Sequence, residues 1–301
     1  MGKFINPFTD YGFKKIFGQE ISKDLLIDFL NDLLRGERVI TDLTFLNNEQ
    51  LPEYDEGRGL IYDIYCCTDT GEKIIVEMQN KSQVHFKERA LYYLSNAIVQ
   101  QGEKGNEWKF HIKAVYGVFF MNFLFNSNVK LRTDVILADR ETGELFTDRM
   151  RQVFIALPLF KKEEAECETD FERWIYTLKN METLKRMPFK ARKAVFEKLE
   201  EIADVSSLSK EERRRYENSV NVYRTNLCVL DAAVQEGVEK GLEKGMEEGV
   251  KLGLEQGLEQ GLEQGRKEER LANARSMKVV GVDSALISKI TGLTESEIAV
   301  L

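Results

Sequence analysis

The sequence predicts an α/β fold in which helices flank a mixed central β-sheet and an α-helical extension follows at the C-terminus. Three observations support this prediction. Over the first 160 residues, short runs rich in Ile, Val, Phe and Tyr, typical of strands, are interspersed with helical repeats. From residue 169 onward the apolar spacing is helical. Between residues 237 and 265 glycine recurs at every fourth position, which sets this segment apart.

Length and composition indicate a globular chain with room for one large domain or two smaller ones. Of the 301 residues, 43% are hydrophobic and 31% are charged. No apolar run reaches 18 residues, and the first 15 residues lack the apolar core of a signal peptide. The four cysteines form no CxxC pair, which argues against a zinc site and favours reduced thiols. These features predict a cytoplasmic protein without a membrane-spanning segment.

The first helix is expected to start at Thr9 or Asp10, either of which is a suitable N-cap. Phe13 and Phe17 are four residues apart and would dock the helix on the core. Asp10 and Lys14 share another face at the same spacing. They are either groups close to a functional site or a surface ion pair beside the cap.

A second helix is predicted to start at Ser22, because Leu and Phe then recur every three to four residues. Gly36 is a suitable stop for this helix. Residues 39–46 predict the first strand. Residues 50–58 are polar and contain a proline, which predicts a loop or a crossing at the sheet edge.

Residues 59–79 predict a β-hairpin made of two apolar runs, 60–67 and 73–79, around a turn that contains glycine. If the loop has three residues, the numbers of paired residues sum to 140, and Asp63 lies directly opposite Glu77. A slip of one residue would place the two acids on opposite faces. The hairpin therefore predicts a specific pair of carboxylates.

These carboxylates point to metal chemistry. Facing residues in a sheet lie roughly 4.5–5.5 Å apart at Cβ, close enough to share one cation. Gln79 lies two residues after Glu77 and on the same face. An unpaired buried carboxylate is unfavourable, and Glu77 interrupts a strand that is apolar on both faces. Mg²⁺ prefers carboxylate ligands and activates water for phosphodiester hydrolysis. The alternative is that Asp63 and Glu77 lie on a solvated face of the hairpin.

A helix is predicted at 83–101, with Arg89 and Tyr93 on one face. This face is either a phosphate-binding surface or the aromatic stripe of an amphipathic helix. Residues 112–125 predict a central strand, and Pro158 is expected to end the sheet. The later elements are predicted as strands at 129–137 and 151–157 around a turn at 141–144, followed by helices from Thr169 onward.

Asp63, Glu77 and Gln79 resemble the PD-(D/E)xK nuclease signature, with Gln79 at the position of the usual lysine. The wider pattern resembles the Rpn-type recombination-promoting nucleases, often labelled PD-(D/E)xK family transposases, over most of residues 4–180. The segments that carry the resemblance are residues 9–18, Asp63, residues 76–79, residues 89–93, residues 102–105 and the glycine-punctuated tail.

The resemblance implies a restriction-endonuclease-like core at 1–180 and a Mg²⁺-dependent DNA endonuclease that promotes recombination or the movement of mobile elements. Asp63 and Glu77 would bind Mg²⁺ or Mn²⁺, and Gln79 would orient the attacking water or a scissile oxygen. Glutamine lacks the positive charge of lysine, which bears on rate and metal stoichiometry. The alternative is a non-catalytic nuclease fold that binds DNA or protein. The residues expected to bind or support DNA phosphates are Asp10, Lys14, Arg89 and Tyr93.

The charge distribution argues against a simple electrostatic clamp on DNA. The net charge is −8, and residues 236–301 contribute −4, with 9 Lys and Arg against 13 Asp and Glu. The preceding residues contribute the other −4. DNA binding therefore requires a local basic patch and a metal. A DDE-type triad, as strand transfer would need, cannot be placed on the sequence.

The glycine segment, 236–266, is expected to be a labile helix or spacer after a helical extension at 181–235. Four residues turn an α-helix by about 400°, so successive glycines shift by about 40° around it. Each interior glycine also destabilises a helix by roughly 0.5–1 kcal/mol relative to alanine. A partner chain that orders this segment would make the protein a homo-oligomer. The many glutamates exclude a membrane helix.

Residues 267–301 predict a small module of two helices separated by a glycine turn. Thr294 and Glu297 form a capping box at the start of the second helix. The module resembles a helix-turn-helix. Glu295 and Glu297, however, stand at the end that would face DNA, which favours a packing or dimerising role.

Overall fold

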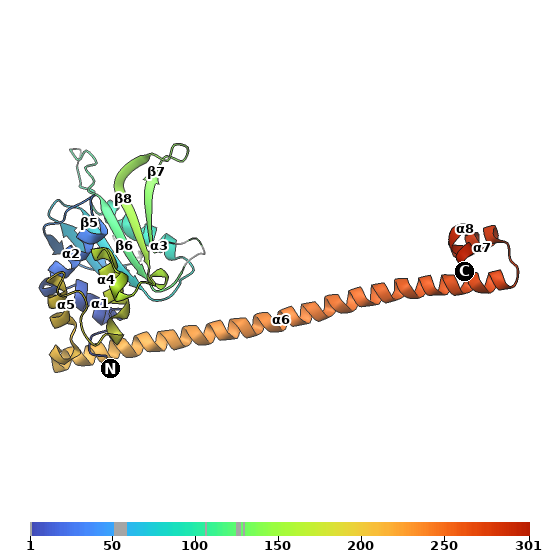
Figure 1. The fold of residues 1–301 in the computed structure, drawn as a ribbon. Helices are drawn as coiled ribbons and strands as arrows, with labels where there is room; N and C mark the ends of the chain where they lie inside the picture. The colour runs from blue at the N-terminus through green and yellow to red at the C-terminus, as the bar shows by residue number, and fades with distance from the viewer. Residues whose placement is uncertain (1, 51–58, 106, 125–127, 129) are drawn as a thin grey trace. The chain divides into compact units, whose positions relative to one another are not determined.

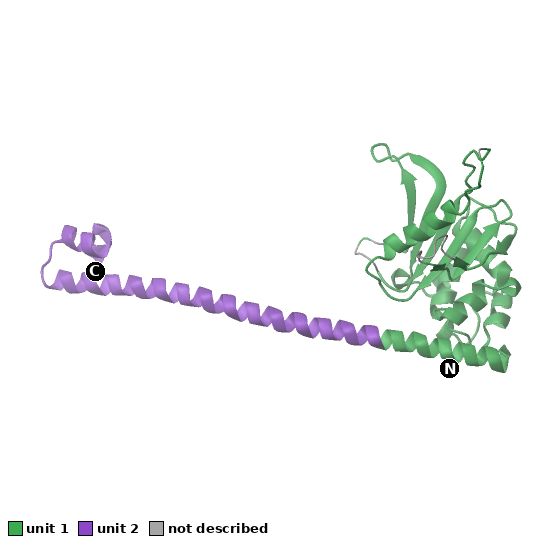
Figure 2. Ribbon diagram, turned by 180° about the vertical axis from the view of Figure 1, so that it is seen from behind, with its two compact units in different colours: residues 1–228 green, residues 229–301 purple. Residues whose placement is uncertain are grey.

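The computed structural model describes residues 2–50, 59–105, 107–124, 128 and 130–301. The chain divides into two compact units, Met1–Cys228 and Val229–Leu301 (Figure 2). The first unit has the predicted α/β architecture, with helices on both sides of a mixed sheet (Figure 1).

Within the described residues, the central sheet has six strands in the order β1-β4-β5-β6-β8-β7. The pairs β5–β6 and β6–β8 are parallel, and the other neighbours are antiparallel. The strands are β1 Leu43–Phe45, β4 Ile64–Thr68, β5 Lys73–Gln79, β6 Val115–Met121, β7 Arg132–Ala138 and β8 Leu145–Ala156, with a separate pair formed by β2 Glu49–Gln50 and β3 Leu60–Ile61.

Several strand boundaries differ from the prediction. The strand expected at 112–125 is shortened to β6 within its described part, and the strand expected at 129–137 starts later, as β7. The strand expected at 39–46 is reduced to β1, because only these three residues pair with β4. The apolar run 60–67 divides at Asp63, because β3 pairs with β2 and β4 pairs with β5. Strand β8 starts six residues before the predicted 151, since it pairs with β7 up to the turn. The loop prediction for residues 51–58 and the last residue of the predicted strand 112–125 lie outside the described residues.

The helices of the first unit cover both faces of the sheet (Figure 1). On one face lie α1 Asp10–Phe17, α2 Lys23–Leu33, α4 Asp170–Asn180 and α5 Val195–Ala203, and on the other lies α3 Phe86–Val99. Short 3₁₀ turns occur at Glu20–Ser22, Leu157–Leu159, Glu164–Glu166, Met181–Thr183 and Val205–Ser207.

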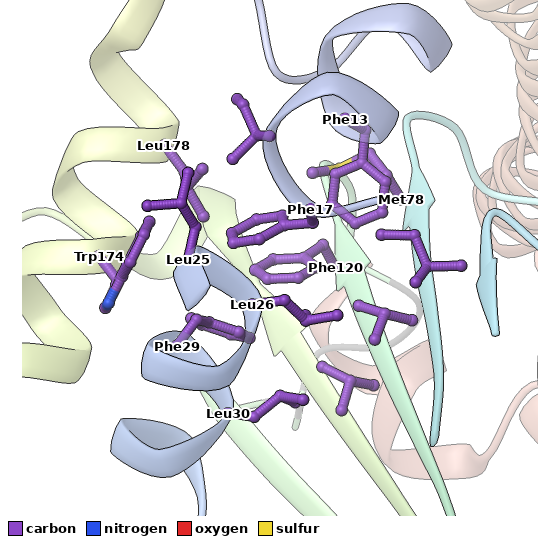
Figure 3. Packing of buried hydrophobic residues seen from close by; sticks show 14 of the residues in the cluster. Phe13, Phe17, Leu25, Leu26, Phe29, Leu30, Met78, Phe120, Trp174 and Leu178 are labelled. Carbon is purple, nitrogen blue, oxygen red and sulfur yellow. The ribbon is translucent and has the colours of Figure 1, made fainter. Parts of the chain in front are cut away.

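Strand β6 is buried over its whole length and divides its side chains between two hydrophobic clusters. Phe120 packs against Phe29, with ring centroids 5.1 Å apart, in the cluster beneath α1, α2 and α4 (Figure 3). Phe119 packs against Phe154 at 5.1 Å on the α3 face. Full burial of each such side chain contributes about 1.5–3 kcal/mol to folding. Because β6 supplies buried side chains to both clusters, it is the central strand of the core.

Gly117 of β6 allows α3 to lie close to the sheet. A Cβ atom at this position would be 2.6 Å from Leu94 of α3 and 2.6 Å from the Phe119 ring. A larger residue would therefore push the helix away from the strands.

The long helix α6, Lys210–Val279, begins in the first unit. Its first turns dock there through Tyr216, whose hydroxyl accepts the N–H of Asn6 at 2.9 Å, and through an ion pair of Glu212 with Lys15 at 2.5 Å. Val220 belongs to the same hydrophobic cluster as Trp174. Residues on both sides of position 180 thus share one core.

The second unit comprises the remainder of α6 with α7 Ser284–Thr291 and α8 Glu295–Val300. The predicted helix, glycine turn and helix are confirmed, since Gly292 has φ +71° and Thr294 forms a capping box with Glu297. Ala274, Ile287, Leu293 and Ile298 form a small core.

The glycine segment is helical without a break, because all of residues 236–266 lie in α6. A Cβ atom at any of its eight glycines would meet no other atom within 4 Å. The apolar residues beside the glycines are exposed, such as Val238 at 65% and Leu254 at 73%. Across the described part of the chain, no helix combines the length and apolar character needed to span a bilayer.

Candidate active site

The register of the hairpin, extended by one residue beyond its last pair, places Asp63 opposite Glu77, as predicted. Ile64 pairs with Val76 and Tyr65 with Ile75, so the numbers of paired residues sum to 140. Two hydrogen bonds link the acids to the facing backbone. The N–H of Asp63 donates to Oε1 of Glu77 at 3.0 Å, and the N–H of Met78 donates to Oδ2 of Asp63 at 2.8 Å. The two side chains therefore meet where β4 begins and β5 ends.

Burial decides between the predicted metal site and the solvated face. Glu77 is only 2% exposed, inside a strand whose neighbours are apolar. Asp63 is half-buried and borders a cavity. The solvated-face alternative is therefore wrong for Glu77, and the pair has the environment in which carboxylates require a counter-charge.

The electrostatics of the pair indicate such a requirement. Burial, together with repulsion from Asp63, raises the pKa of Glu77 to about 8. Burial also raises the pKa of Asp63, although the N–H of Met78 and the charge of Lys14 act in the opposite direction. Arg89 lowers both pKa values without restoring them to their ordinary range. The protein's own cations thus leave two carboxylates that resist ionisation together.

Gln79 is the third member of the group. Its Nε2 donates to Oε2 of Glu77 at 3.1 Å, so the amide holds the carboxylate in place. A lysine here would add a positive charge beside Glu77, whereas the amide adds none. The carbonyl oxygen of the Gln79 side chain remains as an acceptor for water or as a further oxygen ligand.

The donor set fits a hard divalent cation. Among the residues that the structure describes, no cluster of three or more His, Cys, Asp or Glu is arranged to enclose a metal. Mg²⁺ is usually bound by one or two carboxylates and keeps several waters, so it does not need such a cluster. The buried pair and the Gln79 oxygen meet this requirement. Zinc, which takes Cys and His ligands in structural sites, does not fit.

A cavity of about 230 Å³ lies beside Asp63. The end of β5 forms one wall, and the start of α1 forms another. The third wall is α6, which the sequence analysis did not connect with the site. The lining residues on α6 are Ser219, Val222, Tyr223, Asn226 and Leu227.

Tyr223 is tied to the strand ends at the site. Its side chain hydrogen-bonds that of Asn122, and the N–H of Asn122 donates to the carbonyl of Gln79 at 2.8 Å. The sequence does carry one indication that this part of α6 packs against the domain. Tyr216, Val220 and Tyr223 have helical spacing, which marks a buried face on α6. That face docks the helix on α1 and leads into the cavity.

Asp10 and Lys14 form a surface ion pair beside the helix cap and also lie close to the candidate site, so both interpretations of this pair apply. Thr9 caps α1 by accepting the N–H of Gly12, and Asp10 pairs with Lys14 at 2.7 Å on an exposed face. The same Asp10 lines the cavity, and Lys14 acts on the pKa of Asp63. Gly12 is required because a Cβ atom there would lie 2.1 Å from the carbonyl oxygen of Asn6.

On α3, Arg89 and Tyr93 have different environments. Nη1 of Arg89 donates to Oε1 of Gln83 at 2.7 Å, and its guanidinium lies 5.6 Å from the centroid of the Tyr93 ring. Tyr93 is only 8% exposed and packs edge-on against Tyr62 at 5.1 Å. Arg89 is thus the group available for a ligand, and Tyr93 supports it from beneath.

A family model described as "PD-(D/E)XK nuclease family transposase" matches residues 7–233. The matched region includes the carboxylate pair, α3 and the part of α6 that lines the cavity. Comparisons with curated proteins and with solved structures found no match.

Proposed function

The chain belongs to the PD-(D/E)XK nuclease family transposases, and from this membership we propose that it is a metal-dependent endonuclease that hydrolyses phosphodiester bonds in DNA. The observation that carries the proposal is the pair of a buried Glu77 and a half-buried Asp63, which meet where β4 begins and β5 ends, beside a cavity. Family membership implies nuclease activity in general. The metal, the substrate and the residue roles are our proposal.

Mg²⁺, or Mn²⁺ in its place, would be held by the carboxylates of Asp63 and Glu77. When bound, the metal polarises the scissile phosphodiester and makes a water more acidic. The hydrogen bonds from the Asp63 N–H and from Gln79 hold the Glu77 carboxylate for this purpose. Binding would also remove the repulsion that raises both pKa values.

The remaining residues would position the DNA and the water. Gln79 would orient the attacking water or a scissile oxygen through its amide. Lys14 and Arg89 would attract the phosphate, with Asp10 holding Lys14 by the ion pair and Tyr93 supporting Arg89. Because the net charge is −8, DNA binding would depend on these local cations and the metal.

A specific observation favours a second candidate function. Gln79 supplies no positive charge next to Glu77, where the family signature has a lysine. A non-catalytic nuclease fold that binds DNA or protein is therefore the alternative. An electrophoretic shift that persists in EDTA, with no cleavage under any divalent metal, would support it.

We further propose that the protein is a homo-oligomer through residues 236–266. The exposed apolar residues of this segment lie next to glycines that allow a second helix to approach closely. Light scattering should then give a mass above 34.8 kDa for the full chain and a monomer after removal of residues 236–301. We also propose a cytoplasmic location, because all four cysteines are free, as is usual in a reducing compartment. The biological role that we propose for the nuclease is DNA recombination or the movement of mobile elements.

Incubation of the purified protein with supercoiled plasmid and Mg²⁺ tests the nuclease proposal. Wild type should nick the plasmid, and EDTA should stop the reaction. Asp63→Ala should be inactive, while Glu141→Gln, a change of an exposed acid in the turn between β7 and β8, should match wild type. No nicking by wild type, or equal nicking by Asp63→Ala, would contradict the proposal.

A further inference from the structure

A second cavity, of about 750 Å³, adjoins the candidate active site. It lies between residues 59–61 and the first two turns of α3. Gln83 lines both this cavity and the one beside Asp63, so the two are neighbours. The role of this groove is not explained by the carboxylate pair.

The groove exposes apolar and aromatic side chains that soluble proteins usually cover. Val84 is 87% exposed, Ile61 is 65% exposed, and Tyr92 is 53% exposed. Its charged lining comprises Arg89 and Glu88, with His85 nearby. Because the positive charge of Arg89 is offset by Glu88, the groove is not suited to bind a row of phosphates. An aromatic ring beside aliphatic side chains is instead suited to a flat, largely apolar ligand.

We propose that this groove binds a nucleobase next to the scissile phosphate, with Tyr92 as the stacking surface, so that the enzyme prefers single-stranded or locally unpaired DNA. The proposal rests on the proposed nuclease function and names its substrate class. Arg89, which lines the groove and lowers the pKa of both catalytic carboxylates, would hold the phosphate that joins the base to the reacting centre.

The preference for an unpaired strand follows from what a stacking surface needs. In a duplex, both faces of each base are covered by neighbouring base pairs, so a protein ring cannot reach them without flipping. A single strand presents these faces at little cost, and aromatic side chains are the usual platforms for them. Tyr92 is suited to this role because it stands on a helix whose neighbouring residue Tyr93 is buried against Tyr62.

The groove is continuous with the candidate active site and has a cation at the junction. The groove shares Gln83 with the cavity at Asp63, and Gln83 accepts a hydrogen bond from Arg89. A strand that placed one phosphate at the carboxylates would therefore pass Arg89 and bring its next nucleotide to Tyr92.

Binding can be measured apart from cleavage. Fluorescence anisotropy with the full-length Asp63→Ala protein in Mg²⁺ would compare a labelled single-stranded 20-mer with the duplex of the same sequence. Adding Tyr92→Ala should weaken single-strand binding about tenfold and duplex binding much less, since loss of one stacking contact has about this effect. Tyr92→Phe, which keeps the ring, should bind as before.

Phe146→Ala is the matched control, because Phe146 is an aromatic residue that is 82% exposed and lines neither cavity. Equal loss in Tyr92→Ala and Phe146→Ala, or no loss in Tyr92→Ala, would overturn the groove proposal. So would tighter binding of the duplex than of the single strand. If wild type cleaves neither substrate, the nuclease proposal fails, while the anisotropy result still decides whether the groove binds a base.

Discussion

Strand β5 and the glycine segment 236–266 place acidic residues in opposite settings. In β5 a single acid, Glu77, interrupts an apolar strand and is buried. In the glycine segment, glutamates recur on a helix that exposes its polar and apolar residues alike. The same side chain is thus costly in one region and neutral in the other. The difference teaches that the neighbours of a charged residue, rather than its charge, mark it as functional.

Neutralising one acid in each region should have the largest effect of any pair of changes. Glu77→Gln removes one of the two carboxylates of the metal site, so plasmid nicking should fall by roughly 10²-fold or more, the loss typical of a key electrostatic group. Glu243→Gln should leave the rate unchanged when light scattering gives the same mass for this variant as for wild type. The measurement is the initial nicking rate in Mg²⁺. Equal rates for both variants would remove the functional distinction between the two regions.

Truncating one apolar residue in each region tests the packing side of the comparison. Phe120→Ala should lower the free energy of unfolding by about 3–5 kcal/mol, because it leaves a cavity between β6 and α2. At a concentration where the chain is monomeric, Leu254→Ala should change it by no more than about 0.5 kcal/mol, since Leu254 is 73% exposed in the single chain. Urea denaturation followed by circular dichroism gives both values. Equal losses in the two monomeric variants would contradict the comparison, whereas a loss in Leu254→Ala that appears only where the chain oligomerises would support the proposed contact between copies.

Alanine in place of glycine should act with opposite sign in the two regions. Gly117→Ala should destabilise by about 1–3 kcal/mol, since its Cβ would lie 2.6 Å from Leu94. In the monomeric chain, Gly253→Ala should instead stabilise the helix by about 0.5–1 kcal/mol, because no side chain or distant backbone atom lies within 4 Å of its Cβ position. Ellipticity at 222 nm and the midpoint of thermal unfolding report both effects. A loss of helicity in the monomeric Gly253→Ala variant would contradict this prediction, whereas a loss confined to the oligomer would mark Gly253 as a contact between copies.

Stability without metal should also depend on pH. Glu77 has a pKa of about 8 in the folded protein, above its ordinary value, so the folded state binds this proton more tightly. Its contribution is therefore present below the unfolded pKa and is lost as pH rises toward 8. In EDTA, the urea midpoint should fall over this range in wild type and less in Glu77→Gln. Mg²⁺ should restore stability at high pH, and a wild-type midpoint that rises with pH would contradict this assignment.

The sequence predicted the elements whose contacts are local. The length of the hairpin loop determines the pairing of Asp63 with Glu77, and Thr9 and Thr294 cap helices within their own first turns. The family membership followed from the same local motifs. Roles of Asp63, Glu77 and Gln79 in catalysis stay predictions that the proposed experiments test.

What the sequence did not predict depends on contacts between distant segments. Tyr223 reaches the cavity only because α6 docks on α1 through Tyr216, 210 residues away from its partner Asn6. Strand β1 is shorter than predicted because its ladder with β4 covers only Leu43–Phe45. The strand propensity of residues 39–46 does not show where this pairing ends. The glycine segment forms a continuous helix in spite of its weak intrinsic propensity.

The central claim is that Asp63 and Glu77 share one divalent cation. Anomalous diffraction from a crystal soaked in Mn²⁺ tests it most directly, because manganese scatters anomalously and substitutes for magnesium. The account predicts a peak between the two carboxylates that is absent from Asp63→Ala crystals. Manganese bound only to exposed acids elsewhere, with no density between these side chains, would contradict it.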